Sequence, residues 1–125
     1  MRRDLDLVRD ILITVEGADQ PVDDTVLCRD GRTLAEVAFH VELLRERGLA
    51  NGSVRYDGLA GFPVSVEVSG LTWEGYDYLD AIRSNKVWKK AKDAIADSVG
   101  DTSLSVVKQA CTMVATGMIK AHLGM

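Results

Sequence analysis

The spacing of apolar residues changes twice in the middle of the chain. Apolar residues recur at three- and four-residue steps from Leu34 to Leu44, alternate with polar residues over 53–56 and 64–68, and return to helical steps after Leu71. Three- and four-residue steps indicate a helix, whereas alternation indicates a strand. The sequence therefore predicts a helix, a two-stranded β-hairpin and another helix in direct succession.

The first helix of this series and the hairpin have clear end signals. Thr33 and Glu36 form a capping box where the helix begins, and Gly48 supplies its C-terminal stop. Residues 57–61 have the composition of a turn, so they are expected to join the two strands.

The helix after the hairpin begins at a cap formed by Thr72 and ends near Ser84. Residues at helical spacing within it define the side that faces the core. The buried stripe is expected to contain Tyr76, Leu79 and Ile82, with Trp73 as a further candidate.

One more helix precedes this series. Its apolar residues begin at Leu5 and end at Val15, and Gly17 stops it. The next segment, 18–32, contains proline, glycine and paired aspartates, and its only apolar run is 26–28. We expect a connector here, with room for one short strand.

Two helices are expected at the C-terminal end. Apolar residues from Val87 onward predict a helix that stops at Gly100, and Thr102 or Ser103 caps a last helix over 104–122. This last helix carries more apolar surface than one amphipathic stripe needs. It therefore either closes the core or joins a homodimer.

The composition fits one globular domain. The 125 residues are 46% apolar and 27% charged, with the core expected in 1–84 and helices in 85–125. No apolar run approaches the roughly 20 residues of a membrane span, and the first residues lack the apolar run of a signal peptide. A cytoplasmic location without membrane contact is expected.

No known catalytic or metal-binding motif is found. Cys28 and Cys111 lie far apart without cysteine or histidine neighbours at ligand spacing, and His40 and His122 are equally isolated. No Gly-x-Ser-x-Gly, phosphate-binding loop or His-Glu-x-x-His sequence is present. We expect no enzyme, no cofactor and no metal, and a structural hydrogen-bonding role is favoured for His40.

The order of the elements resembles a winged helix. Two motifs carry the resemblance, Leu-Leu-x-x-x-Gly-Leu over 43–49 and Leu-Thr-x-x-Gly-x-x-x-Leu over 71–79. The implied fold is α+β and mostly helical, with a two-stranded hairpin wing and a C-terminal helical extension. The acidic connector 17–32 departs from this pattern, because it leaves little room for the first helix of a helix-turn-helix pair.

Further segments, at 1–9, 40–44 and 79–83, resemble an uncharacterised family known as domain of unknown function twenty-five thirteen. Its members are short bacterial and phage or prophage proteins, and the similarity runs through the Trp-Lys-Lys sequence at 88–90. The resemblance implies a winged-helix fold and no established activity.

Two functions from different classes remain open. Fold analogy favours a DNA-binding transcriptional regulator, although the net charge of −4 removes the broad basic field that supports nucleic-acid binding. Phosphate contacts are then expected at Arg45, Arg47, Arg55, Lys86, Lys89, Lys90 and Lys92. Trp88 either joins these lysines in a nucleic-acid patch or lies in the core, and its helical spacing from Ala91 and Ile95 favours the core.

Local charge favours the alternative, a protein-interaction adaptor or a modulator of a host factor. The outer side of the helix over 33–48 is acidic and partly apolar, whereas a DNA-reading helix more usually presents Arg, Lys, Asn or Gln. Partner contacts are then expected at Phe39, His40, Glu42, Leu43 and Glu46.

Overall fold

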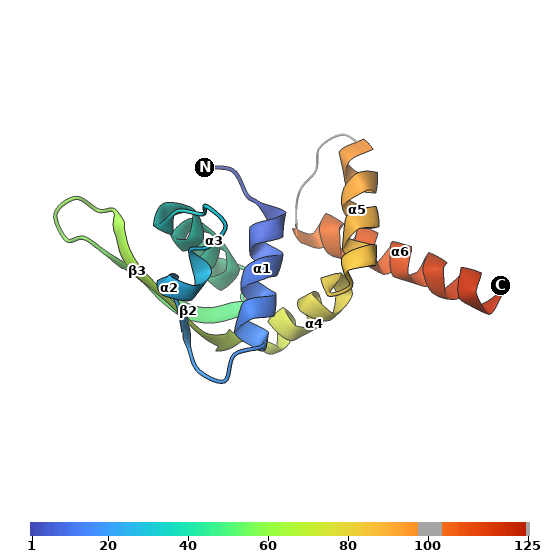
Figure 1. Ribbon diagram of the computed structural model, residues 1–125, viewed down its shortest axis with the longest axis horizontal. Coiled ribbons are helices and arrows are strands. Elements are labelled where there is room, and N and C mark those ends of the chain that lie inside the picture. Colours follow the sequence, from blue (N-terminus) through green and yellow to red (C-terminus); the bar gives the residue numbers. More distant parts are fainter. Residues whose placement is uncertain (98–103, 125) are drawn as a thin grey trace. The chain divides into compact units, whose positions relative to one another are not determined.

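The computed structural model describes residues 1–97 and 104–124. These residues form helices and one antiparallel sheet, so the chain is an α+β protein, mostly helical (Figure 1). The elements are α1 (Leu5–Glu16), β1 (Val22–Asp23), α2 (Asp24–Leu27), α3 (Leu34–Glu46), β2 (Ala50–Tyr56), β3 (Pro63–Leu71), α4 (Trp73–Ile82), α5 (Asn85–Asp97) and α6 (Leu104–Leu123).

The chain divides into two compact units. Unit 1 is Met1–Asp77 and unit 2 is Tyr78–Met125, so α4 begins in the first and continues into the second. The division at residue 84 expected from the sequence stays a prediction. In the described part of the chain, no helix combines the length and the apolar character that crossing a membrane requires.

The sheet of unit 1 has three strands, whereas the sequence predicted two. β3 is the central strand and pairs antiparallel with β2 on one side and with β1 on the other. β1 is only two residues long, with Val22 opposite Val68, and two residues cannot display an alternating pattern. The connector does contain the short strand that was expected, but the apolar run 26–28 lies in and just after the short helix α2 instead.

One face of the sheet packs against α1 and α3 (Figure 1). Alternation along β3 directs Val66 and Val68 into this core and leaves Glu67 exposed between them. Both helices bury most of the stripe that their spacing predicted, but Leu5 and Leu34 are half-buried, and Leu7 and Ala38 are buried in addition. The buried residues are Leu7, Val8, Ile11, Leu12 and Val15 of α1 and Val37, Ala38, Val41 and Leu44 of α3.

Thr72 begins α4, as predicted, because its hydroxyl accepts a hydrogen bond from the Gly75 backbone N–H at 3.0 Å. The predicted buried stripe is wrong in part, since Trp73 is 80% exposed and Tyr76 is 46% exposed, whereas Leu79 and Ile82 are buried.

Gly75 gives the physical reason for this difference. A Cβ atom on Gly75 would lie 1.9 Å from the carbonyl oxygen of Leu49, so this side of α4 approaches the backbone that follows α3. The inner stripe therefore runs from Leu71 through Gly75 to Tyr78, Leu79 and Ile82, and it turns Trp73 and Tyr76 outward.

In unit 2, α5 packs against α6. Ser84 caps α5 by accepting a hydrogen bond from the Val87 N–H, and the Tyr78 hydroxyl donates to the carbonyl of Leu104 at 3.0 Å. Buried residues of the two helices are Val87, Trp88 and Ala91 of α5 and Val107 and Cys111 of α6. The predicted stop at Gly100 and the predicted caps at Thr102 or Ser103 lie outside the described residues.

Candidate interaction surfaces

The outer face of α3 carries most of the side chains expected to contact a protein partner. Ala35 and Glu46 are exposed, and Glu36, Phe39, Glu42 and Leu43 are half-buried. Arg45 lies beside them and is already paired, with its Nη1 2.7 Å from Glu42 Oε1. This face is therefore acidic, because it carries the three carboxylates of Glu36, Glu42 and Glu46, and the one neighbouring guanidinium, that of Arg45, is paired with Glu42.

His40 is expected at the same face by the sequence, but it is 1% exposed. Its Nε2 accepts a hydrogen bond from the Asp4 backbone N–H at 2.7 Å, and its Nδ1 lies 2.6 Å from the Glu36 carbonyl oxygen. A carbonyl only accepts, so Nδ1 carries the proton and Nε2 is the acceptor. The structural role is favoured, because a partner cannot reach this side chain.

The other arginines predicted to contact phosphate are dispersed in unit 1. Arg47 is the C-cap of α3 and Arg55 lies on β2, and both are exposed. Two further arginines are engaged in ion pairs, Arg29 with Asp10 at 2.6 Å and Arg32 with Asp4 at 3.0 Å. Such surface pairs are worth little in stability, but they reduce the free positive charge.

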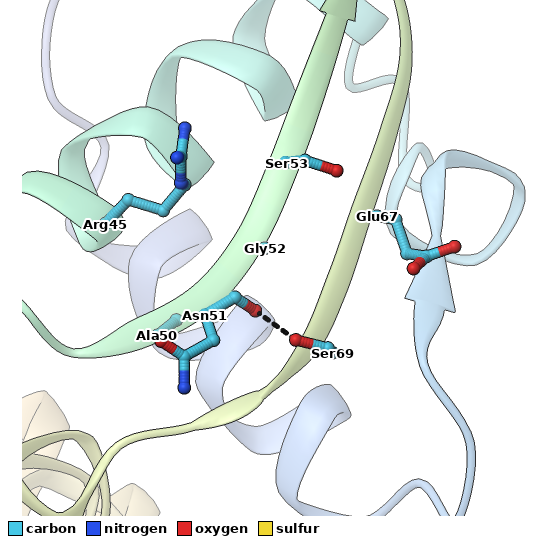
Figure 2. Close-up of a pocket in the computed structure, with 7 residues that line it drawn as sticks. All are labelled: Arg45, Ala50, Asn51, Gly52, Ser53, Glu67 and Ser69. Carbon is cyan, nitrogen blue, oxygen red and sulfur yellow. Dashed lines mark hydrogen bonds between the residues drawn. The ribbon is translucent and has the colours of Figure 1, made fainter.

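An open hollow of about 530 Å³ lies between the end of α3 and the hairpin (Figure 2). It is lined by Arg45, Ala50, Asn51, Gly52, Ser53, Glu67 and Ser69. The Ser69 hydroxyl donates to the Asn51 carbonyl at 3.0 Å, and a Cβ on Gly52 would meet the Glu67 carbonyl at 2.5 Å. The lining offers hydrogen bonds to a ligand, but it brings no nucleophile next to a base.

Only Arg45 of this hollow was singled out from the sequence. The polar lining residues of the hairpin occupy the positions that alternate with the buried ones along the two strands. The alternation of buried and exposed residues along β2 and β3 therefore predicts an outward polar face of the hairpin. It does not predict the hollow, because the hollow forms only where α3 lies beside β2.

The hairpin extends well beyond the helices of unit 1 and ends in an apolar tip (Figure 1). We define the hairpin tip as Tyr56, Leu59, Phe62 and Val64, all of which are exposed.

The turn beneath these side chains is held by its own hydrogen bonds. The Asp57 carboxylate accepts from the Leu59 and Ala60 N–H groups at 2.8 and 2.7 Å, and these two bonds lower the pKa of Asp57. The Asp57 N–H donates to the Phe62 carbonyl at 2.8 Å, and Gly61 takes the positive φ of 72° that the turn requires.

Exposed aromatic residues are unusually frequent in unit 1. The chain has two Trp, three Tyr and two Phe residues, and four of these seven are exposed. Tyr56 and Phe62 belong to the hairpin tip, whereas Trp73 and Tyr76 lie three residues apart on the outer side of α4, which we call the α4 pair. The sequence missed the α4 pair because it assigned Tyr76 to the core and gave Trp73 as a further core candidate.

The lysines of unit 2 lie along α5. Lys86, Lys89 and Lys90 are exposed and share one side of the helix, since they are three and four residues apart. Trp88 is buried, which supports the core interpretation, and the Lys92 Nζ lies 5.8 Å from the centre of its ring. We call the three exposed lysines the α5 lysine row.

The thiols show no sign of reactivity. Burial, and then the charge of Asp24, raise the pKa of the half-buried Cys28, and Cys111 is fully buried. Among residues 1–97 and 104–124, no three His, Cys, Asp or Glu side chains are grouped so that they could hold a metal ion.

These features define a class of small protein with a three-stranded antiparallel sheet under two helices, a projecting hairpin and a separate C-terminal helical unit. The family model described as "Hypothetical protein (DUF2513)" matches residues 2–101, so the chain belongs to this family. An "Uncharacterized protein" of Haemophilus influenzae is 31% identical over 122 residues, which cover 95% of this chain and 99% of that protein. No solved structure matches the chain.

Proposed function

We propose that unit 1 is a winged-helix module that recognises a protein partner. The order α1, β1, α2, α3, β2, β3, with β3 between β1 and β2, supports this assignment, because a winged helix places a hairpin directly after its recognition helix. In this arrangement α3 is the recognition helix and the hairpin is the wing. The helix before it, α2, has only four residues, so the module departs from the usual helix-turn-helix pair.

The acidic outer face of α3 is the observation that carries the proposal. If α3 entered the major groove of DNA, the carboxylates of Glu36, Glu42 and Glu46 would lie between two phosphate backbones and be repelled by them. Affinity for DNA depends on Lys and Arg contacts to phosphate, and Arg45, which lies beside this face, is paired with Glu42. A protein surface with basic residues around an apolar centre fits this face better.

The exposed aromatic residues support the same conclusion. Trp and Tyr are enriched among the residues that dominate protein interfaces, because they bury a large area with few rotatable bonds. The α4 pair and the hairpin tip leave such side chains exposed, outside the buried core of unit 1. Their exposure therefore favours a binding role over a packing role.

Affinity capture with matched variants tests this proposal. The tagged chain would be exposed to lysate of the cells that encode it, and each captured protein would be purified and titrated against the wild type. We expect the double variant Trp73→Ala, Tyr76→Ala or the double variant Leu59→Ser, Phe62→Ser to weaken binding at least about tenfold. Exchange of the exposed aliphatic residues Ile13 and Val26 for alanine is the control.

Equal binding by wild type, test variants and control would contradict the recognition role of the aromatic residues. Circular dichroism melting of each variant shows whether a lost interaction reflects lost folding.

DNA binding is the second candidate, and the α5 lysine row is the observation that favours it. Fluorescence anisotropy with mixed-sequence duplex DNA at about 50 and 200 mM salt separates the two functions, because phosphate-mediated binding weakens steeply over this range. Under the primary proposal no binding is expected at either salt concentration.

Salt-sensitive binding that is lost in Lys89→Gln, Lys90→Gln would establish DNA as the ligand instead. The matched control is Lys108→Gln, Lys120→Gln, which removes the same charge from α6.

Other expectations stay predictions: that the protein is no enzyme, that it is cytoplasmic, and that it has a phage or prophage origin. The expected homodimer concerns α6 of unit 2 and is independent of both proposed ligands.

A further inference from the structure

The two edges of the sheet in unit 1 are finished differently. On one edge, β1 pairs with β3 for only two residues, and the Asp24 carboxylate that follows β1 accepts a hydrogen bond from the Val66 backbone N–H at 3.1 Å. On the other edge, β2 runs for seven residues, and no described strand pairs with its outer side. Folded proteins usually shorten, cover or block an exposed edge, because its unpaired N–H and C=O groups pair with other strands. β2 is therefore the edge that is open to a further strand.

The hydrogen bond of Val66 shows which backbone groups of β2 point outward. An antiparallel strand directs the N–H and C=O groups of successive residues to opposite sides. Because Val66 points toward the β1 edge, its neighbour Glu67 points toward β2, where it lies opposite Ser53. Ser53 therefore points toward β3. The residues on either side of it, Gly52 and Val54, direct their N–H and C=O groups away from the sheet.

This open stretch of β2 is regular. The pairing of β2 with β3 shifts register between Asn51 and Gly52 and again between Arg55 and Tyr56, so residues 52–55 form one even run. The run contains no proline and no lysine, which commonly block an edge. Its two outward residues present two N–H and two C=O groups, and each of these groups can bond to an added strand.

The polar hollow beside this stretch can receive a side chain of the added strand. Asn51 and Ser53 line the hollow from β2, and Arg45 lines it from the end of α3 (Figure 2). Neighbouring residues of adjacent strands point to the same face of a sheet, so the residue beside Ser53 would enter the hollow. The lining combines amide and hydroxyl groups with a guanidinium that is paired with Glu42 and with the carboxylate of Glu67. A short, neutral, polar side chain fits this lining.

We propose that β2 binds an extended segment of another protein as an added strand, with a Ser, Thr or Asn side chain of that segment in the hollow. An extended backbone is the occupant because its N–H and C=O groups repeat at the spacing of an open edge.

A second copy of this chain is a poor occupant of the edge. α3 packs against β2, so pairing of two β2 strands would bring two acidic α3 helices together. The site shares no residue with the α4 pair or the hairpin tip, so this proposal goes beyond the proposed function.

Peptide selection and amide hydrogen exchange test the proposal. Selection of random peptides as long as β2 on the immobilised chain should enrich sequences with Ser, Thr or Asn at one internal position. A selected peptide, synthesised with blocked ends, would then be added to the free chain. Before addition, the Gly52 and Val54 amides should exchange faster than the Ser53 amide, and saturating peptide should slow both at least about tenfold.

Methylation of single backbone nitrogens in the peptide gives a readout that leaves the chain unchanged. Loss of one main-chain hydrogen bond lowers affinity by up to about tenfold. Methylation should therefore weaken binding at alternate residues of the peptide and have little effect at the residues between them. Equal effects at every position would overturn the proposal, because binding would then not use a strand ladder.

Val54→Pro removes an outward N–H of the edge, and Val54→Ile is the matched control because it keeps this group and a β-branched side chain. Val54→Pro should raise the dissociation constant of the peptide at least about fivefold, and Val54→Ile should leave it unchanged. Circular dichroism melting shows whether Val54→Pro folds, and the methylated peptides decide the question if it does not.

Three further outcomes would overturn the proposal. They are the enrichment of no peptide, protection of the Gly52 and Val54 amides in the free chain equal to that of Ser53, and protection that rises with protein concentration. The second outcome would mean that the chain itself covers the edge, and the third that a second copy does. Peptide binding that persists in the α4 pair and hairpin tip variants while capture is lost, or the reverse, separates failure of this proposal from failure of the proposed function.

Discussion

Units 1 and 2 both expose apolar side chains, but they do so in different ways. In unit 1 the exposed groups include four aromatic residues beside aliphatic ones, and the turn and the helix start near these aromatic residues have hydrogen-bonded backbone groups, as at Asp57 and Thr72. In the described part of unit 2 the exposed large apolar residues are Met113, Ile119 and Leu123, none of them aromatic and all on α6. Aromatic anchors are typical of the few residues that dominate protein interfaces, whereas aliphatic residues such as leucine and valine are less frequent among them.

The two units also differ in how their helices are covered. α1 and α3 share a sheet face, so the whole inner stripe of each is buried. α6 has α5 as its partner within unit 2 and buries only part of its length. Substitutions in the inner stripes of α1 and α3 should therefore affect folding, whereas substitutions at the exposed residues of α6 should affect it little.

The largest effect is expected at Gly75. Gly75→Val places side-chain atoms where the Leu49 carbonyl stands, and backbone on both sides prevents a small adjustment. We expect a loss of about 4 kcal/mol in the free energy of unfolding, measured by urea titration. Gly117→Ala on α6 is the control, because a Cβ there meets nothing within 4 Å, and it should stabilise the chain by up to about 1 kcal/mol. Equal stability of the two variants would contradict the close approach of α4.

A pair of identical substitutions measures the difference between the units directly. Leu12 of α1 is fully buried and Leu123 of α6 is 60% exposed. Leu12→Ala should lower the free energy of unfolding by about 3 kcal/mol, since it leaves a cavity. Leu123→Ala should change it by no more than about 0.5 kcal/mol at concentrations where the chain is monomeric. Comparable losses would mean that α6 is covered in the monomer.

His40 provides the next effect in size. His40→Leu removes the acceptor of the Asp4 N–H and a second donor to the Glu36 carbonyl, which keeps its backbone hydrogen bond within α3, so the part-buried Asp4 N–H loses its partner. The expected loss is about 2 kcal/mol in the free energy of unfolding. Phe39→Leu, a neighbouring half-buried position, is the control. An unchanged stability in His40→Leu would show that His40 does not connect the start of α1 to α3.

Three helices of unit 1, α1, α3 and α4, and its hairpin could be predicted because each has a local signal, whereas the four-residue α2 lies in the segment expected to be a connector. Thr33 caps α3, Thr72 caps α4, and the alternation of β3 directs Val66 and Val68 inward. β1 could not be predicted as a member of the sheet, because its two residues acquire strand geometry only by pairing with a distant segment.

The buried side of α4 was predicted wrongly in part, and the reason is physical. Apolar spacing considers side chains alone, so it placed Tyr76 in the core, offered Trp73 as a further core residue and gave no weight to Gly75. The tight contact at Gly75 is made by backbone, which spacing does not detect. The same limit hid the polar hollow beside Arg45, because it forms between α3 and β2 and belongs to neither alone.

The smallest effect concerns Asp57 and the order of the hairpin tip. Its folded pKa is lowered by the Ala60 and Leu59 N–H groups, so the carboxylate stabilises the turn at pH values above its unfolded pKa. This contribution is lost as the pH falls through the folded pKa. Amide hydrogen exchange at Leu59 and Ala60 should therefore become less protected in acid, while exchange in the core of α1 stays unchanged.

Asp57→Asn is the matched variant for this test, because it keeps an oxygen acceptor and removes the charge. It should retain part of the protection at Leu59 and Ala60 and abolish its pH dependence, whereas Asp57→Ala should remove the protection at all pH values. If the tip recognises a partner as a rigid element, Asp57→Ala should also weaken capture, because ordering the turn would then oppose binding. Unchanged protection in Asp57→Ala would show that the hairpin is ordered by its strands and not by this carboxylate.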